Sequence, residues 1–138
     1  MKYNDIYSGS INLSNCIISE NLVLPKKLIG DDLNLSHTNL PENFLLPEII
    51  GRDLYLDNTI FSKNLILPKI ICGNLGLSQL ILPEEFILPK FIGGYLNLNR
   101  STISKNIVWP EILEGSIHLS NSTLMEGCII PKHFKIIY

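Results

Sequence analysis

The chain has 138 residues, which is enough for one domain that buries a single core. Apolar residues make up 46% of it and charged residues 17%, so we expect some apolar surface to stay exposed after folding. Eleven basic against thirteen acidic residues give a net charge of -2, and no run of Lys or Arg is long enough to follow a phosphate backbone. Nucleic acid is therefore not an expected partner.

The sequence also predicts a cytoplasmic protein without membrane contact. No apolar run approaches the roughly 18 residues that a bilayer span needs, and the N-terminal segment MKYNDIYSGS lacks the apolar stretch of a secretory signal. Cys16, Cys72 and Cys128 are odd in number and form no C-x-x-C pair, which favours reduced thiols. We expect the three cysteines to act as small buried hydrophobic residues.

A repeat of about 21 residues organises the chain. Six prolines follow one another at intervals of 22, 21, 21, 21 and 21 residues: Pro25, Pro47, Pro68, Pro89, Pro110 and Pro131. A glycine comes four or five residues after each of the first five prolines. We expect one domain, in which residues 1–9 form an N-terminal edge, 10–130 hold the repeats, and 131–138 form a partial repeat at the C-terminal edge.

Each glycine is followed by an apolar-x-apolar unit, and this period of two predicts a short strand. In chain order the units are Ile11/Leu13, Leu33/Leu35, Leu54/Leu56, Leu75/Leu77, Leu96/Leu98 and Ile117/Leu119. Stacked repeats would place these strands about 4.8 Å apart in one parallel sheet, with the apolar columns facing the core.

A small polar residue or Cys follows the strand in five of the six repeats: Cys16, Thr38, Thr59, Ser101 and Ser122. The fourth repeat has Leu80 at this position. The resulting pattern, L-x-L-x-x-(T/S/C)-x-L, resembles the leucine-rich-repeat signature L-x-L-x-x-(N/C)-x-L, and a unit of 21 residues fits the length of such repeats. Hydroxyls of Thr and Ser can bond backbone groups of the turn, more weakly than the Asn of the signature. Leu80 cannot, so we expect the fourth turn to be the least well held.

The second half of each unit carries three apolar residues, Pro, one further residue and two more apolar residues, as in residues 65–71. Pro together with β-branched residues predicts an extended or polyproline-like convex segment and little helix. The predicted fold class is a mainly β repeat solenoid of leucine-rich-repeat type, with about six units and a parallel sheet on its concave face. Units without convex helices resemble the short L-P-x repeats of bacterial proteins.

The concave sheet is the first candidate for a binding face, because repeat proteins commonly bind there. Its outward positions are polar, and its Asp and Tyr residues gather on the second, third and fifth turns. The predicted partner-binding residues are Asp32, Asn34, Asp53, Tyr55, Asp57, Tyr95, Asn97, Arg100 and His118.

A convex column offers a second candidate, formed by the middle residue of each apolar run: Val23, Leu45, Ile66, Ile87, Val108 and Ile129. Either strict alternation turns this column to solvent as an apolar contact stripe, or wide turns bury it. The sequence leaves both open. At the C-terminus, Phe134, Ile136, Ile137 and Tyr138 either fold over the last turn or leave an edge that pairs with another chain.

No pattern in the sequence predicts an enzyme, a metal site or a cofactor. His37 and His118 are about four repeats apart, hence roughly 19 Å along the stack, too far for a catalytic pair. His133 falls on the convex half. The cluster Asp31, Asp32, Asp53 and Asp57 lacks the spacing of a calcium loop. Catalytic residues and metal ligands are therefore predicted to be absent.

A short repeat domain with a faintly acidic face resembles an immunity protein of a bacterial contact-dependent growth-inhibition or related polymorphic toxin system. That resemblance implies a toxin inhibitor, an antitoxin that binds the toxin domain, for example a nuclease, one-to-one and covers its active site. Two alternatives remain: an effector or adhesin-type leucine-rich-repeat protein that binds a host protein, and a structural repeat that self-associates through its open ends or its convex stripe.

Overall fold

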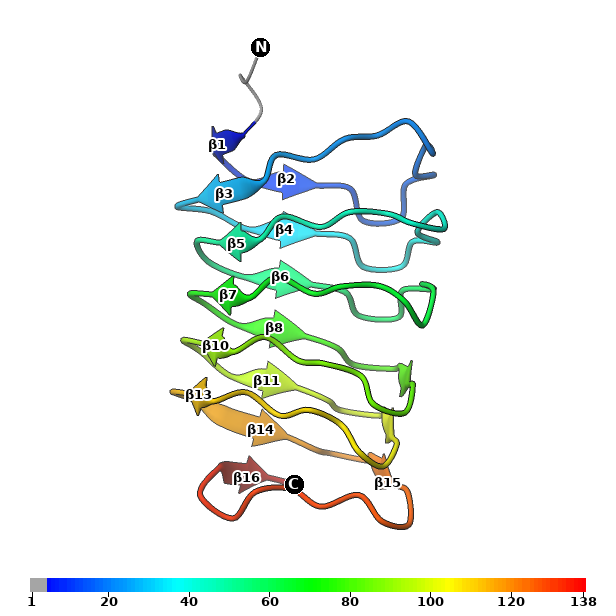
Figure 1. The fold of residues 1–138 in the computed structure, drawn as a ribbon, viewed down its shortest axis with the longest axis vertical. Coiled ribbons are helices and arrows are strands. Elements are labelled where there is room, and N and C mark those ends of the chain that lie inside the picture. Colours follow the sequence, from blue (N-terminus) through cyan, green and yellow to red (C-terminus); the bar gives the residue numbers. More distant parts are fainter. Residues whose placement is uncertain (1–4) are drawn as a thin grey trace.

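The computed structural model describes residues 5–138 as a parallel β-solenoid of about six turns, and these residues contain no helix. Figure 1 shows the turns stacked along the long axis, each entering on the left, crossing to the right and returning. The predicted repeat solenoid is confirmed. None of the described residues belongs to a helix able to cross a membrane.

The predicted sheet on the L-x-L units is present and is called sheet B. It has seven parallel strands in the spatial order β16-β14-β11-β8-β6-β4-β2. Leu33, Leu54, Leu75, Leu96 and Ile117 lie directly opposite one another from strand to strand. Its strands in chain order are β2 (Ile11–Asn12), β4 (Leu33–Asn34), β6 (Leu54–Tyr55), β8 (Leu75–Gly76), β11 (Leu96–Asn97), β14 (Ser116–His118) and β16 (Lys135–Ile137).

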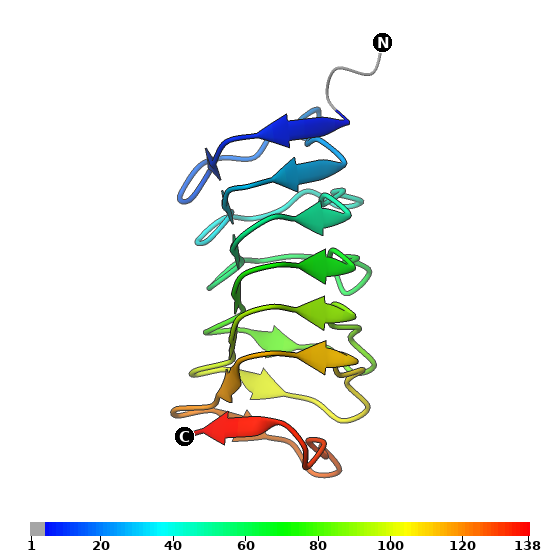
Figure 2. The same cartoon turned by 90° about the vertical axis from the view of Figure 1, so that its left-hand side faces the viewer.

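The convex segments are more regular than the sequence predicts. They are extended, but the residues after each of the first five repeat prolines also form strands, and with β1 these make a second parallel sheet of six strands, called sheet A, in the order β1-β3-β5-β7-β10-β13. Its strands are stacked at the front of Figure 2. Its strands are β1 (Ile6–Ser8), β3 (Lys27–Ile29), β5 (Ile49–Ile50), β7 (Ile70–Ile71), β10 (Phe91–Ile92) and β13 (Ile112–Leu113).

A third, three-stranded sheet, called sheet C, lies on the side of the turn away from sheet A. It consists of β9 (Ile81–Leu82), β12 (Thr102–Ile103) and β15 (Thr123–Leu124). Each turn therefore has four sides: sheet A, sheet B, the sheet C side, and a return segment that runs opposite sheet B (Figures 1 and 2).

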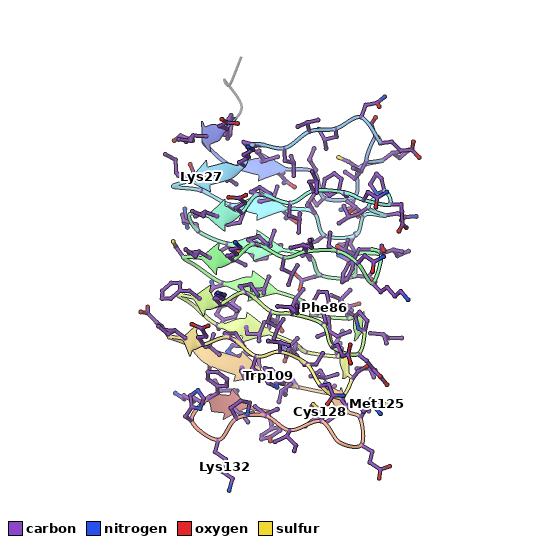
Figure 3. All side chains as sticks on the ribbon, in the orientation of Figure 1. Lys27, Phe86, Trp109, Met125, Cys128 and Lys132 are labelled. Carbon is purple, nitrogen blue, oxygen red and sulfur yellow. The ribbon has the colours of Figure 1, made fainter. Side chains whose placement is uncertain are left out.

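The core fills the space between these sides with aliphatic residues that stack on their equivalents one turn away. Leu56, Leu77 and Leu98, which directly follow sheet B strands, and Ile50 and Ile71 from sheet A are fully buried. Phe86 is also buried and stacks on Phe61 with ring centroids 5.8 Å apart. Figure 3 shows the side chains of Phe86 and Trp109 lying over the stack and that of Lys132 pointing away from it.

The glycine column is required by close approach of neighbouring turns. A Cβ on Gly115 would overlap the carbonyl oxygen of Gly94, and a Cβ on Gly94 would overlap the side-chain oxygen of Asn74. The next corner uses a different device, a residue at positive φ after each sheet B strand: Asn15, His37, Asn58, Gln79, Arg100 and Asn121.

Hydroxyls in the Thr/Ser column bond backbone carbonyls, that of Thr38 in its own turn and those of Thr59, Ser101 and Ser122 in the turn before. Thr59 Oγ1 donates to the oxygen of Leu35 at 2.9 Å, and Ser122 Oγ donates to that of Leu98 at 2.5 Å. Leu80 has no hydroxyl, but Ser101 compensates from the following turn: its Oγ accepts from the N–H of Leu80 at 3.1 Å and donates to the oxygen of Leu77 at 2.7 Å.

None of the three cysteines is buried: Cys16 and Cys72 are exposed and Cys128 is half-buried, so the prediction that they are buried hydrophobic residues is wrong. At the C-terminus, Phe134 is buried while Ile136 pairs with Ile117, so this segment extends sheet B by one strand. Of the predicted N-terminal edge, residues 1–4 lie outside the described residues.

Candidate functional site

The predicted binding residues lie together on the outward face of sheet B. Asn34, Tyr55, Asn97 and His118 are strand residues of β4, β6, β11 and β14, and their side chains are partly exposed. The other predicted residues flank these strands, and all are at least partly exposed: Asp32, Asp53, Asp57, Tyr95 and Arg100. The structure therefore brings the nine residues onto one surface.

A column of side-chain oxygens next to the glycine corner joins consecutive turns. Asp32 Oδ1 accepts from the N–H of Asp53 at 3.0 Å, and Asp53 Oδ1 accepts from that of Asn74 at 2.7 Å. Asn74 Oδ1 accepts from Tyr95 N–H at 2.9 Å. Asp32 and Asp53 therefore hold the backbone of the next turn as well as being predicted partner contacts. We call this series of bonds the oxygen ladder.

A second ladder follows the far end of the strands. Asp57 Oδ1 accepts from both the N–H of Ser78 at 2.8 Å and its hydroxyl at 2.7 Å. Asn99 Oδ1 accepts from the N–H of Ser120 at 2.8 Å. The carboxylate of Asp57 also needs the absence of a side chain at Gly76, since a Cβ there would lie 2.5 Å from Asp57 Oδ2.

Tyr55 is held by the ladder through its hydroxyl, which donates to Asp53 Oδ2 at 2.7 Å. This hydrogen bond, with burial and the nearby Asp53 charge adding to it, raises the pKa of Tyr55 above its usual value. The hydrogen bond fixes the orientation of the phenol ring, which stays partly exposed.

Tyr95 and His118 form a second aromatic element of the face. Their rings stack with centroids 4.8 Å apart at 14°, and His118 Nε2 is 3.0 Å from the Ser116 hydroxyl. Stacking limits the rotamers of both rings, so their exposed surfaces are fixed before any partner arrives.

The face is acidic over its second and third turns. Asp31, Asp32, Asp53 and Asp57 lie there, and Arg52 approaches Asp31 and Asp32 at 3.9 and 3.8 Å. Those two ion pairs are long and solvent-exposed, so they hold Arg52 weakly. Four carboxylates against one guanidinium leave this part of the surface negative.

Asn74, Ser78 and Asn99 are at outward positions of the same predicted face but not among the predicted binding residues, and they bond to the neighbouring turn alongside those residues. A signal was available, because Asp32, Asp53 and Asn74 recur at the repeat interval in one column and all carry a side-chain oxygen. Asn121 is also not among the predicted binding residues. With Arg100, Asn97 and Ser78 it lines a shallow open depression of about 270 Å³ at the far corner.

The histidines stay apart on different turns. His37 Nδ1 lies 3.1 Å from Asn58 Nδ2 at a corner of the second turn, His118 bonds Ser116 on β14, and His133 packs against Phe134. Within residues 5–138 no group of three or more His, Cys, Asp or Glu side chains is placed to hold a metal ion.

Comparisons with protein-family models, with curated proteins and with solved structures gave no significant match to this chain.

Proposed function

We propose that this chain is a protein-binding module that uses the outward face of sheet B, and that it acts as a cytosolic immunity protein against a toxin domain. The observation that carries the proposal is preorganisation: the two oxygen ladders, the Tyr55–Asp53 bond and the Tyr95–His118 stack fix this surface before binding. Rigid aromatic and polar groups lose little conformational freedom when they bind, so more of the contact energy becomes affinity.

The charge of the face selects the kind of partner. Asp31, Asp32, Asp53 and Asp57 complement a basic protein surface, such as the substrate groove of a nuclease toxin. A one-to-one contact of about 1,600 Å² would cover such a groove. The mechanism is steric: the bound module keeps substrate out, and its carboxylates occupy positions that the substrate phosphates would take.

Co-expression with the product of the adjacent gene tests the function. We expect growth to be rescued and the two proteins to purify together. Absence of both rescue and co-purification contradicts the toxin proposal, and capture of a host-cell protein after delivery supports the effector alternative instead.

Charge-neutral variants test the face. Replacing Asp32, Asp53 and Asp57 by Asn keeps an oxygen for the ladders and removes three charges, together with the Asp53 Oδ2 acceptor of the Tyr55 hydroxyl. Compared with Tyr55→Phe alone, we expect association to slow about tenfold or more and to lose most of its salt dependence. The matched control removes three charges elsewhere: Asp5→Asn, Glu85→Gln and Glu114→Gln. Equal slowing in both triple variants would show that net charge, and not this face, governs binding.

A further inference from the structure

The return segment, on the side of each turn opposite sheet B, presents an apolar stripe that no described residue covers. One aliphatic side chain per turn points to solvent, with 48% to 80% of its surface exposed: Val23, Leu45, Ile66, Ile87, Val108 and Ile129. Its chain neighbours turn inward, as shown by the buried Phe44, Leu67 and Leu88. Of the two arrangements that the sequence allowed for this column, the exposed one is present.

The stripe is large enough to form an interface. An aliphatic side chain exposed to this degree offers on the order of 100 Å² of apolar surface, so six in line offer roughly 600 Å², the upper end for a monomer's largest patch. The turns are about 4.8 Å apart, so the stripe extends for about 25 Å along the stack. With the bordering atoms it approaches the roughly 800 Å² that each partner contributes to a stable complex.

Two columns of exposed charges border the stripe, three residues before and three residues after it. The column before it is mainly acidic, with four Glu and two Lys: Glu20, Glu42, Lys63, Glu84, Lys105 and Glu126. The column after it is mainly basic, with four Lys and two Glu: Lys26, Glu48, Lys69, Lys90, Glu111 and Lys132. The stripe is thus flanked by opposite charges on its two sides.

We propose that this side is a homodimer interface, in which two copies of the chain pack stripe against stripe around a two-fold axis parallel to the solenoid axis. That symmetry sets the acidic column of each copy against the basic column of the other, and it closes the assembly as a dimer. Like turns meet, so the charges are opposite on turns one, four, five and six: Lys26–Glu20, Lys90–Glu84, Glu111–Lys105 and Lys132–Glu126.

Turns two and three carry the exceptions. There the symmetry brings Glu48 near Glu42 of the other copy, and Lys69 near Lys63. Ser62 already donates a hydrogen bond to Glu42 at 3.1 Å, which moderates the first contact. The second contact leads to a specific prediction. Lys63→Glu would replace the repulsion between Lys63 and Lys69 of the other copy by an attraction, and it should therefore tighten the dimer.

Both sheet B faces stay outward in such a dimer, since they lie on the opposite side of each turn. The dimer would therefore present two copies of the candidate binding face. The inference does not depend on the proposed function, because it concerns only the chain with itself.

Sedimentation analysis of the purified chain between about 1 and 200 µM tests the dimer. We expect a species of twice the 15.6 kDa chain mass. Ile66→Glu should weaken association at least tenfold, because it buries a charge at the centre of the stripe. The matched control is Ile81→Glu on the sheet C side, where the native side chain is 80% exposed compared with 77% for Ile66; it should leave association unchanged.

Cross-linking tests the symmetry. With the three native cysteines replaced by Ala, the single variants Leu45→Cys, Ile66→Cys and Ile87→Cys should each cross-link to themselves with a short bis-maleimide, and Ile81→Cys should not. An antiparallel dimer would cross-link only the position nearest its axis. A monomer over the whole concentration range, equal effects of Ile66→Glu and Ile81→Glu, or cross-linking at one position alone would each overturn the proposal.

Discussion

Replacing Ser101 by Ala removes the one side chain that serves two backbone groups of the fourth turn. Ser101 is buried, and its Oγ accepts from Leu80 N–H at 3.1 Å and donates to the oxygen of Leu77 at 2.7 Å. A buried backbone group left without a partner costs about 1 to 3 kcal/mol, so Ser101→Ala should lower the free energy of unfolding by about 2 to 6 kcal/mol. Domains of this kind are stable by only about 5 to 15 kcal/mol.

Urea unfolding followed by circular dichroism measures this loss, at one low protein concentration so that association does not contribute. Ser101→Thr keeps the hydroxyl in a column that already contains Thr38 and Thr59, and it should stay within about 1 kcal/mol of the native chain. Ser122→Ala removes only the bond to Leu98 and should cost about 1 kcal/mol. A loss below about 0.5 kcal/mol for Ser101→Ala would refute the argument that one hydroxyl compensates for Leu80.

Two further predictions concern the core and the aromatic face. Leu56→Ala truncates a fully buried side chain and should cost about 2 to 5 kcal/mol in urea unfolding, whereas the same change at the exposed Leu45 should cost under 1 kcal/mol below the concentration of association. A small loss at Leu56 would place that column on the surface. The raised pKa of Tyr55 favours the neutral phenol in the folded state, so its contribution is present below the usual pKa near 10 and is lost as pH rises above it. The stability of the native chain should therefore fall toward that of Tyr55→Phe above about pH 10, and a constant difference from pH 8 to 11 would contradict the Asp53 hydrogen bond as its source.

The ladder changes what a mutation on the candidate face can test. From the sequence, Asp53 is a solvent-facing residue whose removal should leave stability nearly unchanged. In the structure its carboxylate accepts from Asn74 N–H and from the Tyr55 hydroxyl, so Asp53→Ala would remove bonds between turns as well as a partner contact. Asp53→Asn can keep the Oδ1 bond to Asn74 N–H, but it loses both the charge and the Oδ2 acceptor of the Tyr55 hydroxyl, so its effect on binding is compared with that of Tyr55→Phe, which loses only the hydroxyl bond.

The repeat, the strands of sheet B and the buried apolar columns follow from the sequence alone. In a parallel solenoid each turn packs on a copy of itself, so residues such as Leu54 and Leu75 meet their equivalents one period away and the period becomes visible in one dimension. Alternation over two positions then assigns Leu54 and Leu56 to the core and Tyr55 to the outward face.

Only the tertiary structure decides what lies between those strands. Whether Ile66 faces solvent or the core depends on the path of the return segment before the bend at Lys69, and the pairing of Ile70 into sheet A depends on where that bend leaves the chain. The double role of Asp53 is likewise set by its distance from Asn74, which belongs to the next turn. These features come from contacts between residues about 21 positions apart and from corner geometry, and a pattern of residue types does not encode either quantity.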